Sequence, residues 1–237
     1  MKTITKLAAA FSLATAGFAA PALAEPIMLD AGSVGQSYTI DYDGFANGNT
    51  IDGLTAQTIF TLTGISGSTY TFDYAVTNTS TGTVDGRISS FAFNTDPDIA
   101  SASSTGAYNF VVTDSNYPNG IGTVDVCFKA ANSGSCAGNR GGLFAGETGT
   151  GSLTLNFLTA PTSITLDDFF VRYQSVTGAG NIGSASGQQT STSTSGGTPV
   201  PAPGGMLGLF ALALLGFGLA RRRPRGAAAD IGQPAYA

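Results

Sequence analysis

Histidine and tryptophan are both absent from this 237-residue chain, and cysteine occurs only twice. Without histidine, the chain can form no Ser-His-Asp or Cys-His catalytic arrangement and no histidine-ligated metal site. A general acid or base would have to be a carboxylate or a tyrosine. The candidate carboxylate pairs are Asp41/Asp43, Asp96/Asp98 and Asp167/Asp168. Aspartate is also an ordinary residue of turns, so we expect a protein that is not an enzyme.

Charged residues are scarce as well, at 11% of the chain compared with roughly 25% in ordinary soluble domains. Between residues 25 and 203, four basic residues stand against fourteen acidic ones, which gives this region a net charge of −10. Nucleic-acid recognition requires a basic surface, so the composition argues against nucleic acid as a partner. The abundant Thr, Tyr, Phe and Val favour β-strands, which is typical of an exported all-β protein.

The first 24 residues have the three parts of a secretory signal peptide. Lys2 and Lys6 supply positive charge, the apolar stretch "LAAAFSLATAGFAA" follows, and the small residues "ALA" end the segment. We expect export through the Sec translocon and cleavage by signal peptidase between Ala24 and Glu25.

The two cysteines, Cys127 and Cys136, have eight residues between them, mostly Ala, Asn, Ser and Gly. An even number of cysteines in an exported chain predicts a disulfide. Closing so short a loop stabilises the fold by about 2–3 kcal/mol in the chain-entropy model. A metal site is the alternative, and its remaining ligands would have to be carboxylates.

Residues 25–177 repeatedly place apolar residues at every second position, which predicts strands with one buried face. The clearest inward-facing sets are Tyr38, Ile40 and Tyr42; Tyr70, Phe72, Tyr74 and Val76; Val124, Val126 and Phe128; and Leu153, Leu155 and Phe157. Segments rich in Gly, Asn and Asp separate these strands. The spacing predicts one antiparallel, jelly-roll-like β-sandwich domain.

One of these segments, "SITLDDFFVRYQSV", changes phase. Ile164 and Leu166 begin one face, and Phe169 resumes it one residue out of step. This slip predicts a β-bulge or bend at residues 167–168, with Phe170 on the opposite face.

Two ligands are suggested by the predicted loops. Asp41, Asp43, Asn47, Asn49 and Asp52 space oxygen donors along a glycine-rich stretch, which suits Ca²⁺. A plain hairpin turn is the alternative for this stretch.

Carbohydrate is the second ligand suggested, by analogy with other β-sandwiches. If exposed, Tyr108, Tyr117 and Phe170 would be able to stack against a sugar ring.

Residues 178–199 are rich in Gly, Ser, Thr and Gln without apolar periodicity, which predicts a flexible linker. The uncharged, mostly apolar stretch Met206–Ala220 would form a helix about 22 Å long. This length is near the lower limit for a transmembrane helix, whose cytoplasmic end the arginines Arg221, Arg222 and Arg223 would mark. Residues 200–225 therefore predict a sorting or anchor segment, and residues 226–237 a short tail.

The order of proline motif, apolar helix and arginine cluster resembles the PEP-CTERM sorting tail. Val200, Pro201, Ala202 and Pro203 stand where that family has Val-Pro-Glu-Pro. The resemblance implies recognition by an exosortase, a membrane peptidase of Gram-negative bacteria that make exopolysaccharide. The alternative is a plain C-terminal anchor, because Ala202 replaces the glutamate and residues continue beyond the arginines.

The segments "FTLTGISGSTYTFDYAVTNTS", "GTVDVCF" and "SITLDDFFVRYQS" look most like the cistern family of PEP-CTERM proteins. That group has no assigned activity, so the resemblance implies location and fold only. We expect a structural or adhesive protein of the cell envelope, surface or exopolysaccharide matrix, as found in biofilms. A glycan- or calcium-binding module held by a plain anchor is the alternative.

Overall fold

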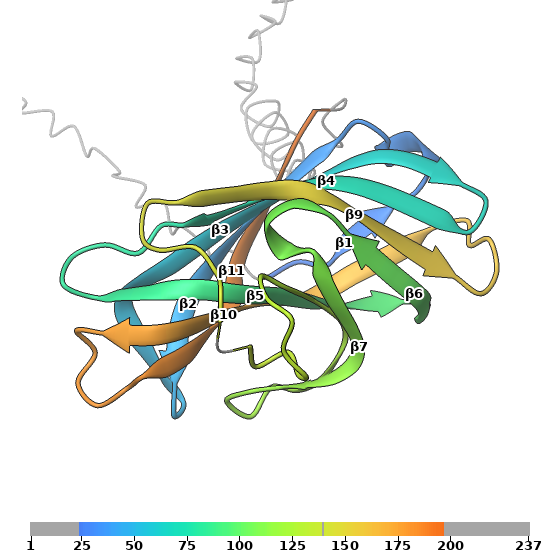
Figure 1. Ribbon diagram of the computed structural model, residues 1–237. Coiled ribbons are helices and arrows are strands. Elements are labelled where there is room, and N and C mark those ends of the chain that lie inside the picture. Colours follow the sequence, from blue (N-terminus) through green and yellow to red (C-terminus); the bar gives the residue numbers. More distant parts are fainter. Residues whose placement is uncertain (1–23, 139, 197–237) are drawn as a thin grey trace, which may run out of the picture. The chain divides into compact units, whose positions relative to one another are not determined.

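The computed structural model describes residues 24–138 and 140–196 (Figure 1). The elements in chain order are β1 (Ile27–Leu29), η1 (Ala31–Ser33), β2 (Ser37–Ala46), β3 (Asn49–Ser66), β4 (Thr69–Asn78), β5 (Asp85–Asp96), β6 (Ile99–Ser104), η2 (Gly106–Tyr108), β7 (Phe110–Tyr117), β8 (Gly122–Lys129), β9 (Thr148–Phe157), β10 (Ile164–Thr177) and β11 (Ser184–Ser195). The two helices are short 3-10 turns, so the all-β prediction is confirmed for the described residues.

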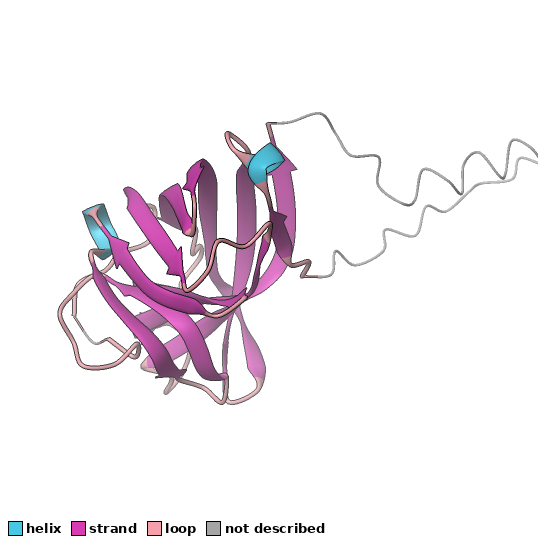
Figure 2. Ribbon diagram, turned by 90° about the vertical axis from the view of Figure 1, so that its right-hand side faces the viewer, coloured by secondary structure: helices cyan, strands magenta, loops and turns pink. Residues whose placement is uncertain are grey.

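The strands form one antiparallel sheet in the order β6-β9-β4-β3-β2-β11-β10-β5-β8-β7, and β1 pairs with β10 beside β11. Hydrogen bonding is therefore continuous instead of being divided between two separate sheets. The terminal strands β6 and β7 are joined through η2 and contact each other, so the sheet is nearly closed like a barrel. Figure 2 shows the strands curving around a common interior.

Alternation of side chains brings the predicted apolar sets to the buried positions of their strands. The interior is largely aromatic: Phe60 lies 5.8 Å, between ring centroids, from each of Phe91, Phe93 and Phe169. Phe91 also stacks on Phe128 at 4.9 Å. Such ring pairs contribute about 0.5–1.5 kcal/mol each beyond the area they bury, which explains how a chain with few charges holds a stable core.

The phase slip in β10 is confirmed. The register between β10 and β5 shifts between Asp167 and Phe170, and Asp168 adopts a left-handed φ of 48°. Phe169 therefore enters the aromatic interior, while Phe170 joins a second, smaller cluster with Tyr117 and the two cysteines. This smaller cluster lies on the outer side of β5, β8 and β10.

The predicted linker at residues 178–199 is wrong for most of its length, because residues 184–195 form the strand β11 in the middle of the sheet. One position of this strand shows how closely its neighbours pack. A Cβ at Gly187 would lie 2.6 Å from a Val171 methyl carbon and 3.0 Å from the Tyr173 ring. A side chain is therefore excluded at Gly187, so this buried position adds no apolar residue to the sequence pattern.

No helix within residues 24–138 and 140–196 is long and apolar enough to cross a membrane. The predicted helix at residues 206–220 lies outside the described residues. So do the sorting motif at residues 200–203, the arginines at residues 221–223 and most of the signal peptide.

Candidate functional site: a hydroxyl-lined sheet face

Six adjacent strands of the barrel-like sheet carry polar side chains on their outward face, which we call the hydroxyl face. Its residues are Ser191, Ser193 and Ser195 on β11; Ser37, Thr39 and Asp41 on β2; Gln57 and Thr61 on β3; Thr69, Thr71, Asp73 and Thr77 on β4; Thr148, Thr150, Ser152, Thr154 and Asn156 on β9; and Ser101 and Ser103 on β6. All of them are exposed or half-buried.

Strand register lines these residues up in rows across the sheet. One row pairs Ser37 with Thr61, Thr61 with Asp73, and Asp73 with Ser152. Neighbouring strands lie about 4.8 Å apart, and alternate residues along a strand about 6.7 Å apart. Apart from the apolar residues Ile59 and Ala75, the outward positions therefore form a two-dimensional array of hydroxyl, amide and carboxylate groups.

Cross-strand hydrogen bonds fix many of these side chains. The hydroxyls of Ser37 and Thr61 lie 2.7 Å apart, and those of Thr77 and Thr148 lie 2.9 Å apart. At the other end of β4, Thr69 donates to the Asn156 amide oxygen at 2.9 Å. Because these rotamers are already restricted, a ligand binding here would lose less side-chain entropy than on an unordered surface.

The charged groups of the face are both carboxylates and are held by neighbouring strands. Asp41 accepts from Gln57 at 2.9 Å through one oxygen and from Ser191 at 2.8 Å through the other. Asp73 accepts from Ser152 at 2.9 Å. No lysine or arginine belongs to the face, so it offers hydrogen-bond donors and acceptors with a small negative charge.

The predicted calcium donors are not brought together. Asp41 and Asp43 lie on β2, whereas Asn47 and Gly48 form the β2–β3 turn with φ angles of 54° and 76°. Six residues of strand, from position 41 to position 47, span about 20 Å. The hairpin interpretation is therefore confirmed. In the described part of the chain, no group of three or more His, Cys, Asp or Glu could hold a metal ion.

The aromatic residues predicted to stack on sugar are buried, so that prediction is wrong. Tyr108 is fully covered and donates to the Ile88 carbonyl at 2.9 Å. Tyr117 and Phe170 face each other in the outer cluster, with ring centroids 5.7 Å apart. They pack in this cluster because the bulge in β10 turns Phe170 outward beneath β7.

The bulge also brings a group of aspartates together. Asn94 donates to Asp168 at 3.1 Å, and the Thr95 backbone N–H donates to Asp125 at 2.7 Å. Burial raises the pKa of the Asp167 carboxyl above its ordinary value, and nearby carboxylates raise it further. Asp167 was a sequence candidate, whereas Asp125 was not, because only the pairing of β5 with β8 brings it near.

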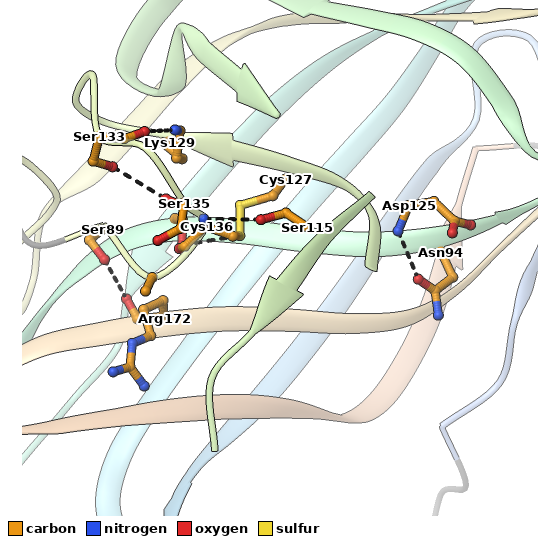
Figure 3. Close-up of a disulfide and its surroundings, with 12 residues drawn as sticks. Ser89, Asn94, Ser115, Asp125, Cys127, Lys129, Ser133, Ser135, Cys136 and Arg172 are labelled. Atoms are coloured by element: carbon orange, nitrogen blue, oxygen red, sulfur yellow. Dashed lines mark hydrogen bonds between the residues drawn. A yellow bond between two sulfur atoms is a disulfide. The ribbon is translucent and has the colours of Figure 1, made fainter. Parts of the chain in front are cut away.

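The predicted disulfide between Cys127 and Cys136 is present, with Cα atoms 5.9 Å apart and both residues fully buried (Figure 3). It ties the loop after β8 to the outer side of the sheet. The Cys136 carbonyl accepts from Ser90 at 3.0 Å, and its backbone N–H donates to Ser115 at 3.3 Å. The bridge therefore fastens a covering loop over the smaller apolar cluster.

The residue after the predicted signal cleavage site is held by the sheet. The Glu25 carbonyl accepts from Gln189 at 3.1 Å and from Thr192 at 3.2 Å, both on β11. Cleavage between Ala24 and Glu25 stays a prediction, and it would leave an N-terminus directly before β1.

Fold and surface together describe an antiparallel, barrel-like all-β domain with one hydroxyl-rich face. The chain matches no protein-family model, and no curated protein or solved structure shows significant similarity to it.

Proposed function

We propose that this chain is an exported structural or adhesive protein, sorted by an exosortase-like peptidase and held at the cell surface or within an exopolysaccharide matrix. The signal-peptide pattern and the C-terminal tail support the location. The single observation that supports the role is the hydroxyl face, because its hydrogen-bonding groups are complementary to those of a polyhydroxylated polymer.

The partner that fits this face is a neutral polysaccharide. Sugar hydroxyls both donate and accept, and the threonine, serine and amide groups of the face do the same. A polyuronate would meet Asp41, Asp73 and the net charge of −10 between residues 25 and 203, so repulsion disfavours it.

A glycan-binding module held by a plain C-terminal anchor is the second candidate. Two features of the sequence favour it: Ala202 in the position of the motif glutamate, and the segment "PRGAAADIGQPAYA" beyond the arginines. Both candidate functions use the hydroxyl face to contact a glycan. They differ in whether the C-terminal tail is cleaved or kept as an anchor.

Mass spectrometry of the mature C-terminus separates these two candidates. The protein would be purified from cells with and without an exosortase. A chain that ends near Ala202 only when the enzyme is present supports sorting, whereas a chain retaining Ala237 in both supports the plain anchor. Full-length protein with its signal peptide, recovered from the cytoplasm, would contradict export.

Binding at the hydroxyl face is tested by sedimentation of the protein with an insoluble neutral glucan, with a polyuronate gel as the charged comparison. Ala75 lies at the centre of the face, in register with Ile59 and Thr150. We expect Ala75→Arg to weaken glucan binding at least tenfold. The matched control is Thr113→Arg, an exposed position on β7 away from the face. Equal binding by both variants would refute the assignment of this face.

A further inference from the structure

Two charged side chains are buried among the described residues, and both are positive. Arg172 on β10 is 6% exposed and Lys129 on β8 is 2% exposed. Both extend from the outer side of the sheet, near the disulfide loop (Figure 3). The region from residue 25 to residue 203 has a net charge of −10, yet the charged side chains buried in the described residues are both cations. This burial needs a physical explanation.

The partners of the Arg172 guanidinium are all neutral. Nη1 donates to the Ala185 carbonyl at 3.1 Å. With the Asn119 amide turned so that its oxygen faces the donors around it, Nη1 also donates to that oxygen at 3.1 Å. Nη2 donates to the Ser184 hydroxyl at 2.8 Å. No carboxylate in residues 24–138 and 140–196 pairs with this side chain, so its charge has no counter-charge within that part of the chain.

The guanidinium also has one N–H group without an acceptor. Its Nε is buried without a hydrogen-bond partner, and so is the hydroxyl of Tyr117 in the same outer layer. Nε and Nη2 form the side-on edge through which arginine binds carboxylates in a bidentate manner. Burial lowers the pKa of the Arg172 guanidinium, because water no longer hydrates its charge.

Burying an ion costs several kcal/mol unless an opposite charge and hydrogen bonds compensate for its lost hydration. Neutral oxygens accept hydrogen bonds from Nη1 and Nη2 of Arg172, but Nε has no acceptor and no opposite charge is paired with the guanidinium. This arrangement is the chemistry of an anion site, with a fixed cation and a buried N–H that has no acceptor.

We propose that Arg172 binds a small monovalent anion, chloride or a simple carboxylate, along its Nε–Nη2 edge. The anion neutralises the buried guanidinium and stabilises the junction of β10, β11 and the turn that carries Asn119. This proposal is independent of the proposed function, because it concerns the outer side of β10 and not the hydroxyl face.

The test measures the unfolding equilibrium of the full chain at constant ionic strength, with fluoride replaced stepwise by chloride in one series and by formate in another. Above the dissociation constant, each tenfold rise in a bound anion raises the folding equilibrium constant about tenfold. We expect this dependence in the wild type. We expect its loss in Arg172→Lys, which keeps a positive charge without the Nε–Nη2 edge.

Lys129→Met is the matched control, because it removes the other buried cation, whose ammonium donates to the Ser133 carbonyl. This variant should keep the anion dependence. Chloride-35 NMR of the wild type gives a second readout that needs no variant, since a bound chloride broadens the resonance and formate would reverse the broadening. The same anion dependence in Arg172→Lys as in the wild type would overturn the proposal. So would an absence of both chloride broadening and a formate effect.

Discussion

The place of β11 in the sheet leads to a sharp prediction about truncation. A chain ending at residue 196 keeps every described strand, whereas a chain ending at residue 183 lacks β11 and nothing else of the sheet. If residues 178–199 were a flexible linker, both chains would fold equally well. Because β11 pairs at five positions with β10 and at nine with β2, we expect only the longer chain to fold.

The loss of stability on deleting β11 can be estimated from the side chains that this strand covers. Its Gly187 packs against Tyr42, Val171 and Tyr173, which are at most 1% exposed. Exposing three such side chains costs about 5–9 kcal/mol at 1.5–3 kcal/mol each. Domains of this kind are stable by about 5–15 kcal/mol in total. Loss of β11 therefore removes most or all of the net stability.

Near-UV circular dichroism and thermal unfolding of the two purified chains provide the measurement. The chain to residue 196 should give a fixed aromatic signal and one cooperative transition. The chain to residue 183 should give neither. If the shorter chain unfolded cooperatively at the same temperature as the longer one, the assignment of residues 184–195 to the sheet would be refuted.

Three further predictions concern single sites. Replacing Cys127 and Cys136 together by alanine should lower the free energy of unfolding by about 2.7 kcal/mol for a ten-residue loop, measured by urea denaturation. An unchanged urea midpoint in this double variant would contradict the prediction. Gly178→Ala should destabilise strongly, because φ is +75° and the new Cβ would lie 2.0 Å from a carbonyl oxygen of the β4–β5 loop. Gly180→Ala, with φ of +64° and open space around it, should cost only about 1–2 kcal/mol in the same assay. Asp167→Asn should stabilise the protein at pH 7 and lose that advantage on acidification. The raised pKa of Asp167 means that the folded state disfavours the carboxylate, so wild-type stability falls as pH rises from the ordinary value of 3.8 through the raised one. Equal pH profiles for both proteins would refute this.

The candidate site was only partly predictable. Alternation showed that residues such as Thr39, Thr61 and Thr150 point away from the core, but not that they share one surface. Their assembly depends on which strands are neighbours, and β4 pairs with β9 across about 70 intervening residues. The outer cluster was equally hidden, because a period-two pattern identifies one buried face and gives no sign that a loop covers the other.

The sequence by itself determined the strand character of most of the chain, the disulfide and the bulge in β10. These depend on local causes: alternation along a strand, the short spacing of two cysteines, and a one-residue slip at Asp167 and Asp168. Only the tertiary structure decided that residues 184–195 form a central strand and that Tyr108, Tyr117 and Phe170 are buried. It alone also decided that Arg172 is buried without a counter-charge among the residues that the structure describes. The physical reason is that the space around a residue, and the charges near it, come from segments that are distant in the chain. The bulk of Val171 and Tyr173 requires a glycine at position 187 of β11, and no pattern within residues 178–199 indicates that requirement.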